Sequence, residues 1–179
     1  MDEEITLEEL GEKLDDPAVN TDHVYVHWTA GHYGQHLDDY HINIDSDGSV
    51  YLTRPLWDTP AATWRRNYGS IAVTLDGCWD ASIYKDGHCD FGSEPPTNEQ
   101  IEALAQVLAT ISNHTGIPIA PNYMMTHAEV AELDGYGPNT TCERWDLWAL
   151  PGSTEWGSGG DYIRGKAIFY QQQGEGEDE

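Results

Sequence analysis

Short apolar runs, separated by polar loops that contain glycine, occupy most of the middle of this sequence. Their valine, isoleucine and aromatic content is typical of β-strands, and each run is too short for a helix. Asp47-Gly48 falls between two of the runs, at the spacing of a tight hairpin turn. The runs that we predict as strands are Val24–Trp28, Tyr40–Asp45, Val50–Leu52, Ile71–Leu75 and Tyr123–Thr126.

One long amphipathic segment, Thr97–Asn113, interrupts these runs. Its apolar residues recur at helical spacing, Thr97 and Gln100 have the spacing of a capping box, and Gly116 is placed to end the helix. A strand, a hairpin, a further strand, a helix and a last strand therefore follow one another along the chain. That order predicts a single α/β domain with a central mixed β-sheet flanked by helices.

The two ends of the sequence differ from the middle. Residues 1–20 form an acidic lead with a short helix predicted over residues 5–15, where Thr6 and Glu9 have capping-box spacing. The main folded domain is predicted to cover residues 21–170, and Arg144–Leu150 within it resembles the start of another helix. Residues 171–179 hold no core-forming side chain, so we expect a disordered acidic tail there.

The chain is strongly acidic, with a formal net charge of −24 and three lysines among its 179 residues. Such a surface repels nucleic acid and anionic membranes, so we expect neither as a partner. The sequence has no apolar run of the roughly 18 residues that a membrane-spanning helix needs. Its acidic start, Met1–Ile5, lacks the apolar segment of a secretory signal peptide. We therefore expect a cytoplasmic monomer without membrane insertion.

Two histidines, His27 and His127, each stand at the end of a predicted core strand. Such a position holds the imidazole rigidly at the edge of the sheet, where solvent and substrate arrive. Two imidazoles with one carboxylate or thiolate form a zinc site that keeps a coordination position open, as in zinc hydrolases. The loop after His127 offers Asp134, Cys142 and Asp146 as a third ligand. On these residues alone, an ordinary structural role for both histidines is the main alternative.

Several segments, taken in order, match the pattern of a known family: Val26–Ala30, Tyr40–Gly48, Arg66–Val73, Gln100–Ile111 and Thr126–Glu129. The sequence resembles the zinc-dependent N-acetylmuramoyl-L-alanine amidases of the type-2 amidase and peptidoglycan-recognition superfamily, phage endolysins in particular. Arg144–Leu147 and Gly160–Ala167 are similar to the ending of a phage-type subgroup. The resemblance runs from about Val24 to Tyr170.

The resemblance implies roles for individual residues. His27 and His127 would bind zinc, and the third ligand would be Asp146 or Cys142, because relatives use either an Asp or a Cys just before the last helix. Tyr40 matches the family's active-site tyrosine, whose hydroxyl donates a hydrogen bond to the oxyanion that forms when water attacks the amide. Glu129 is a candidate shuttle for the proton that the leaving amine takes up.

Two positions depart from the family pattern. Thr74 stands where some relatives carry a glutamate that acts as general base, and a threonine hydroxyl does not serve in that role. Some relatives also carry a lysine two residues before the third ligand. That position is Thr140 if Cys142 is the ligand and Arg144 if Asp146 is. The group that transfers protons is therefore left open.

The reaction implied by the resemblance is hydrolysis of the amide bond between N-acetylmuramic acid and the L-alanine of the peptidoglycan stem peptide. A phage or prophage endolysin would perform it on the cell wall after release from the cytoplasm. Trp28, Trp64 and Tyr33 are candidate walls of the substrate cleft. Two alternatives remain: a module of the same fold that binds muropeptides without cutting them, and an intracellular amidase that recycles muropeptides.

Overall fold

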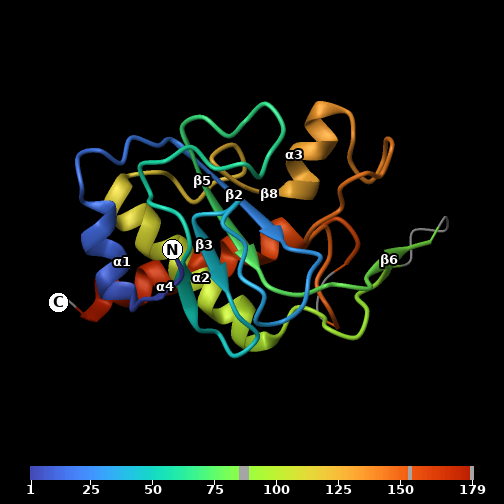
Figure 1. Ribbon diagram of the computed structural model, residues 1–179, viewed down its shortest axis with the longest axis horizontal. Coiled ribbons are helices and arrows are strands. Elements are labelled where there is room, and N and C mark those ends of the chain that lie inside the picture. Colours follow the sequence, from blue (N-terminus) through green and yellow to red (C-terminus); the bar gives the residue numbers. More distant parts are fainter. Residues whose placement is uncertain (85–88, 153–154, 178–179) are drawn as a thin grey trace.

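The computed structural model describes residues 1–84, 89–152 and 155–177. Its centre is a six-stranded sheet in the order β1-β4-β3-β5-β2-β8 (Figure 1). A smaller sheet pairs β6 with β7. The strands are β1 (Glu3–Glu4), β2 (His23–Trp28), β3 (Ile42–Ile44), β4 (Val50–Leu52), β5 (Ser70–Leu75), β6 (Ser82–Ile83), β7 (Cys89–Asp90) and β8 (Met124–Thr126).

The direction of the strands determines where polar residues gather. Strands β3, β5, β2 and β8 are parallel, whereas β4 is antiparallel to β3 and β1 is antiparallel to β4. Every residue of β5 and nearly every residue of β2 is buried, as expected for parallel strands that are covered on both faces. The carboxyl ends of the four parallel strands meet at one edge of the sheet, the usual place for a site in such a sheet.

Helices cover the sheet unevenly. Helix α2 (Asn98–Thr115) packs along α4 (Gly159–Glu177), and α1 (Leu7–Leu14) packs beside α2. Helix α3 (His127–Asp134) begins directly after β8 and lies at the other end of the molecule from α1 (Figure 1). The largest core side chains, which include Leu104, Leu108 and Ile111 of α2, are fully buried with the isoleucines of β3 and β5.

The structure confirms the predicted fold class, a single domain with a mixed sheet flanked by helices. The hairpin forms between β3 and β4. Both predicted capping boxes are present, Thr6 with Glu9 on α1 and Thr97 with Gln100 on α2. Helix α2 ends at Gly116, whose φ of 80° lies in the left-handed region that glycine adopts without strain.

The acidic lead shares the core of the main domain. Strand β1 pairs with β4, and Ile5, Leu10 and Leu14 are buried in the main hydrophobic cluster. The side chain of Asp2 contacts His36. Residues 1–20 are therefore part of the sheet and its helical layer.

Two predicted elements differ from the structure. The prediction of a helix over Arg144–Leu150 is wrong: the segment is irregular, and Leu147 has a left-handed φ of 63° that no α-helix contains. Helix α4 extends through Glu177, across most of the tail expected to be disordered, and Gln171 bonds to Ser112 and Asn113 of α2. Residues 178–179 lie outside the described residues. None of the described helices is both long and apolar enough to cross a membrane.

Candidate functional site

Two histidines enter the site, one from strand β2 and one from the start of the helix that directly follows β8. His27 lies near the end of β2 and is 1% exposed, while His127 is the first residue of α3 and is 5% exposed. Strands β2 and β8 pair in parallel register, so both imidazoles reach the same edge of the sheet. Thr126 caps α3 at the junction and fixes the point where the strand becomes a helix.

The segment after α3 brings Asp146 back to these histidines. Leu147 is fully buried in the core, and the ring of Trp145 packs edge-on against Trp28 at a centroid distance of 4.7 Å. The backbone of Asp146 accepts a hydrogen bond from Ala128, 3.3 Å away. These anchors on both sides place the carboxylate of Asp146, itself 5% exposed, against the two rings.

Three ligand atoms converge at this point. The Nδ1 atoms of His27 and His127 are 3.0 Å apart, and Oδ2 of Asp146 lies 3.5 Å from Nδ1 of His127. Two ligand atoms bonded to one tetrahedral zinc ion, each at roughly 2.0–2.1 Å, lie about 3.3–3.4 Å apart. The observed separations fall on either side of that value. The donor set of two imidazoles and one carboxylate is also that of zinc hydrolases.

Hydroxyl groups hold the far nitrogen of each ring. Nε2 of His27 lies 3.1 Å from Oγ1 of Thr63, and Nε2 of His127 lies 3.3 Å from the hydroxyl of Tyr136. If both Nε2 atoms carry the proton and donate it to these oxygens, both Nδ1 lone pairs face each other and Asp146. Bare lone pairs 3.0 Å apart repel unless a cation lies between them. The residues present therefore fit a bound zinc ion.

Burial and charge set the protonation of His27 and Asp146. Burial, together with the neighbouring His127, lowers the pKa of His27 to about 3, so its ring is neutral at physiological pH. Burial alone would raise the pKa of Asp146, but the hydrogen bond and charge of His127 lower it overall. A neutral imidazole and an ionised carboxylate are the forms that bind metal.

Tyr40 and Thr74 lie beside His27. The ring of Tyr40 is 5.2 Å from that of His27. Burial and the charge of Asp146 raise the pKa of Tyr40, so its hydroxyl keeps its proton and serves as a donor. Thr74 is directly opposite His27 in the register of β2 and β5, and it is fully buried.

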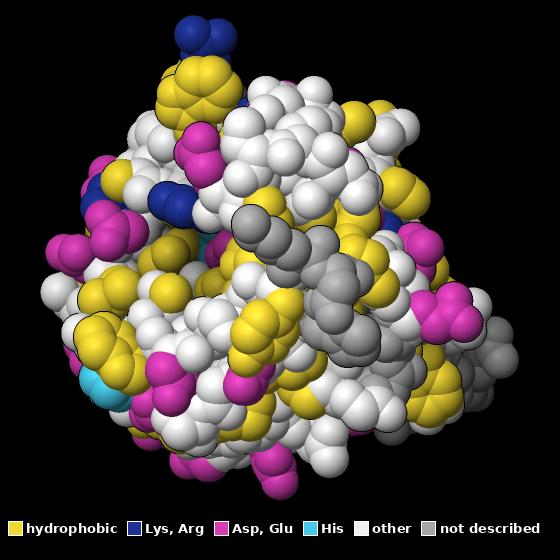
Figure 2. All heavy atoms as spheres, turned by 90° about the vertical axis from the view of Figure 1, so that its right-hand side faces the viewer, with side chains coloured by type: hydrophobic (Ala, Val, Ile, Leu, Met, Phe, Trp, Pro, Cys, Tyr) yellow, Lys and Arg dark blue, Asp and Glu magenta, His cyan; other side chains and the backbone are white. Residues whose placement is uncertain are grey.

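A cleft runs past these groups on the face shown in Figure 2. It consists of two hollows of about 450 and 460 Å³ that share Ala62, His127, Glu143 and Arg144. Figure 2 shows a depression with histidine and acidic atoms at its floor and hydrophobic and basic side chains around it. Trp64 lines one hollow and Trp28, Trp79 and Tyr40 line the other. His127 therefore lines both hollows and Asp146 lines one of them, whereas His27 is buried and lines neither.

Comparison with known proteins identifies the family of this chain. A family model described as N-acetylmuramoyl-L-alanine amidase matches residues 17–145, most of the chain. The chain belongs to this amidase family. The amidase is therefore a hydrolase of peptidoglycan amide bonds. No curated protein sequence gives a match.

Two solved structures are similar to this chain at low sequence identity. The Ph2119 endolysin from a Thermus scotoductus bacteriophage is 19% identical, with a TM-score of 0.50 over 82% of this chain and 84% of that one. LysCS, an endolysin N-acetylmuramoyl-L-alanine amidase from Clostridium intestinale, is 18% identical, with a TM-score of 0.49 over 69% of this chain and 79% of that one.

The structure separates the two candidates for the third ligand. His27, His127 and Asp146 form a group whose ligand atoms all lie within 4.8 Å of one another, and Cys142 is not part of it. Cys142 lies in the turn after α3, where its backbone N–H bonds to Gly137 and its φ is 60°. The chain turns there and reaches the site four residues later.

The structure does not bring Glu129 to the site of the amidase. Its carboxylate accepts two hydrogen bonds from Arg164 of α4, at 2.7 and 2.8 Å, and another from the backbone of Thr126. These bonds direct Glu129 toward α4, so a shuttle role does not fit its position. Tyr33 lines neither hollow of the cleft, and its hydroxyl donates to the carbonyl of Pro95.

Sequence reasoning missed Thr63 and Tyr136. Thr63 lies in the loop before β5, and Tyr136 follows Gly135 at the end of α3. Neither has a local pattern around it that points to a histidine. Their role depends on the paths of two loops, which the ion pair between Arg66 and Asp134 joins through contacts of 2.7 Å from Nε and from Nη2.

Proposed function

We propose that this amidase is a zinc-dependent endolysin, of phage or prophage type, that cleaves the bond between N-acetylmuramic acid and L-alanine in peptidoglycan. The observation that carries the proposal is the convergence of Nδ1 of His27, Nδ1 of His127 and Oδ2 of Asp146 at the floor of an open cleft. The phage-type assignment is supported by the resemblance of Arg144–Leu147 and Gly160–Ala167 to that subgroup.

We assign His27, His127 and Asp146 as the zinc ligands. Bound zinc supplies a Lewis acid for the scissile carbonyl and lowers the pKa of water at the open position. The protein holds the three ligands rigidly, since His27 lies on β2, His127 directly follows the paired strand β8, and Asp146 belongs to a segment anchored by Leu147. Thr63 and Tyr136 keep the reactive nitrogen of each ring toward the metal.

Tyr40 and Arg144 stabilise the negative charge that develops on the carbonyl oxygen. Tyr40 lines the cleft with its hydroxyl protonated, and a preorganised donor of this kind strengthens its bond as the oxyanion forms. Arg144 lines both hollows and stands two residues before Asp146, at the position of the lysine in some relatives. Because Arg164 holds Glu129, we assign protonation of the leaving amine to water in the cleft.

Mass spectrometry of digested peptidoglycan tests the reaction. We expect release of intact stem peptides that begin with L-alanine, and loss of this release when EDTA removes the metal. The Asp146→Ala variant should lose both zinc and activity. Cys142→Ala, a matched control in the same loop, should keep both.

Three other experimental results would contradict the proposed function or the ligand assignment. Binding of muropeptides without any cleavage by the zinc-loaded protein would favour the non-catalytic module. Cleavage of soluble muropeptides with no action on intact cell walls would favour the recycling amidase. Zinc loss in Cys142→Ala rather than Asp146→Ala would contradict the ligand assignment.

A further inference from the structure

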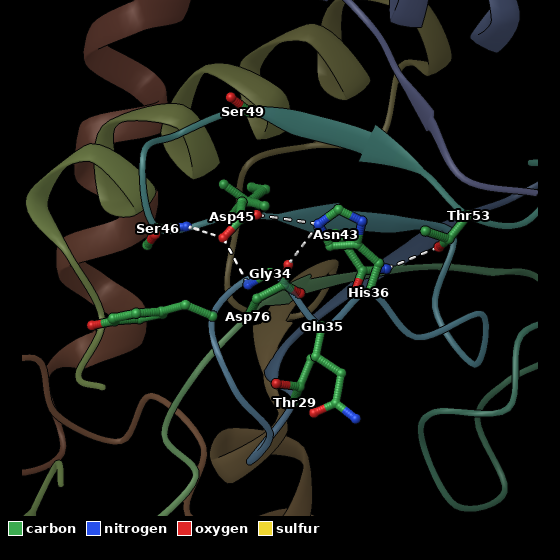
Figure 3. A network of polar contacts seen from close by, with 12 residues as sticks. Thr29, Gly34, Gln35, His36, Asn43, Asp45, Ser46, Ser49, Thr53 and Asp76 are labelled. Atoms are coloured by element: carbon green, nitrogen blue, oxygen red, sulfur yellow. Dashed lines mark hydrogen bonds and ion pairs between the residues drawn. The ribbon is translucent and has the colours of Figure 1, made fainter. Parts of the chain in front are cut away.

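A second group of metal-binding side chains lies at the same edge of the sheet. Asp45 directly follows β3 and Asp76 directly follows β5, and the two strands are paired so that Ile44 is opposite Leu75. The backbone N–H of Asp76 bonds to the carbonyl of Ile44 at 3.0 Å, which continues that pairing. His36 joins them from the segment between β2 and β3 (Figure 3).

The ring of His36 is oriented as a metal ligand would be. Its Nε2 lies 3.3 Å from Oδ2 of Asp45 and 3.3 Å from Oδ2 of Asp76, and Figure 3 shows the ring directed at both carboxylates. Its Nδ1 lies 2.9 and 3.0 Å from the two carboxylate oxygens of Asp2. A proton on Nδ1, donated to Asp2, leaves the Nε2 lone pair facing two carboxylates. A carboxylate behind the ring is the usual support of a metal-binding histidine.

The buried carboxylate of Asp76 has an ion-pair contact with His36 but no hydrogen bond among the described residues. Its side chain is 0% exposed, and across the described residues neither of its oxygens accepts a hydrogen bond. Asp45 differs, because its Oδ1 accepts from the backbone of Gly34 and of Ser46. A buried ionised carboxylate without donors is costly unless a cation compensates it. One imidazole among the carboxylates of Asp2, Asp45 and Asp76 leaves an excess of negative charge.

We propose that His36, Asp45 and Asp76 bind a second divalent transition-metal ion, separate from the one at His27, with Asp2 holding the imidazole in place. The imidazole nitrogen favours an ion such as Zn²⁺ over Ca²⁺ or Mg²⁺, which prefer oxygen ligands. The two separations of 3.3 Å also match the roughly 3.3–3.4 Å between ligand atoms of tetrahedral zinc.

Such an ion would join the first residues of the chain to a wall of the cleft. Gly77 follows Asp76 and exchanges two hydrogen bonds with the hydroxyl of Thr29, at 3.1 and 3.3 Å. Thr29 and Cys78 line the cleft. The second ion would therefore act on stability and on the position of this wall, and it would take no part in the reaction.

Metal analysis after loading with Zn²⁺ and removal of the excess tests the proposal. We expect two zinc ions per chain in the wild type, one in Asp76→Asn, one in Asp146→Asn and none in the double variant. Asp38→Asn, which removes an exposed carboxylate near His36 in the sequence, should retain two. Circular dichroism checks that each variant is folded, and His36→Gln provides a second variant if Asp76→Asn is not.

A titration isolates the second site. The Asp146→Asn protein, which keeps only this site, should bind one Zn²⁺ and unfold at a higher temperature when it is bound. Adding Asp76→Asn or His36→Gln should abolish both effects. One zinc per wild-type chain, lost in Asp146→Asn and kept in Asp76→Asn, would overturn this proposal and leave the amidase site intact. The reverse pattern would overturn the amidase ligands alone.

A proton is the competing partner of Asp76. Burial raises the pKa of Asp76 to about 8, so a neutral carboxyl group would also reduce the cost of its position. In that case Zn²⁺ would change neither the unfolding temperature of Asp146→Asn nor its metal content. That result would also contradict the second site.

Discussion

The hydroxyl groups of Thr63 and Tyr136 contact the Nε2 atoms of His27 and His127, and the two Nδ1 atoms face each other. An imidazole has two different nitrogens, and the hydrogen bond made by one decides what the other can bind. Here hydroxyl oxygens lie 3.1 and 3.3 Å from the Nε2 atoms of His27 and His127, so both Nδ1 atoms are available to a metal. The geometry of the site thus depends on two residues outside the group of His27, His127 and Asp146.

Tyr136→Phe removes one of these supports with little change in shape. We expect its zinc affinity to fall by about 10- to 100-fold, because the ring of His127 loses the partner that orients it. Competition with a chelator measures this affinity directly. Tyr68→Phe is the control, since Tyr68 is 91% exposed. Equal zinc affinity in the two variants would show that Tyr136 does not orient the ligand.

The sequence predicts the site residues unequally. His27 and His127 are recognisable because each ends a strand, and the strand direction alone brings them together. The sequence does not show whether Asp146 or Cys142 joins the two histidines, because both residues belong to one irregular loop. The left-handed φ angles at Cys142 and Leu147 set the path of that loop, and no periodic pattern predicts them.

At the scale of secondary-structure elements, Arg164 connects α4 with α3 and β8. It lies on α4, forms an ion pair with Glu129 of α3 and donates to the carbonyl of Met124 in β8 at 2.9 Å. Its side chain is only 7% exposed, so this pair is largely shielded from solvent. The start of α3, and with it His127, is therefore held in place from behind by α4.

Glu129→Gln tests whether this residue supports the fold or transfers protons. Loss of one partner leaves the buried charge of Arg164 poorly compensated, so we expect about 3 kcal/mol less stability against unfolding. Denaturant unfolding measures this loss. The kcat of the folded variant at low temperature should match that of the wild type. A stable variant with a greatly reduced kcat would instead indicate a shuttle.

Local signals explain which helices are predictable. Helices α1 and α2 carry capping boxes and a clear apolar face, and both are predicted. Helix α3 has the same box, Thr126 with Glu129, but no clear apolar face, and it is not among the helices predicted above. Helix α4 contains several glycines and has weak intrinsic propensity, so its packing along α2 must stabilise it.

At the scale of the whole molecule, we expect the net charge of −24 to influence how the protein approaches its substrate. Cell walls that carry anionic polymers repel such a surface at low ionic strength. Screening shortens the reach of this repulsion from about 30 Å at 0.01 M salt to about 10 Å at 0.1 M. We therefore expect the rate of cell-wall lysis to rise over this range. A rate that falls steadily from the lowest salt concentration would contradict this expectation.

The two sides of the sheet end in different ways. On one side the last strand is β1, only two residues long, which covers β4. At the other edge, the guanidinium of Arg164 donates a hydrogen bond to the carbonyl of Met124 in β8. Open strand edges recruit strands from other molecules, and short or covered edges prevent this. Both edges of the sheet are therefore protected against edge-to-edge aggregation. Removal of the residues before Ile5 would delete β1 and leave the edge of β4 uncovered.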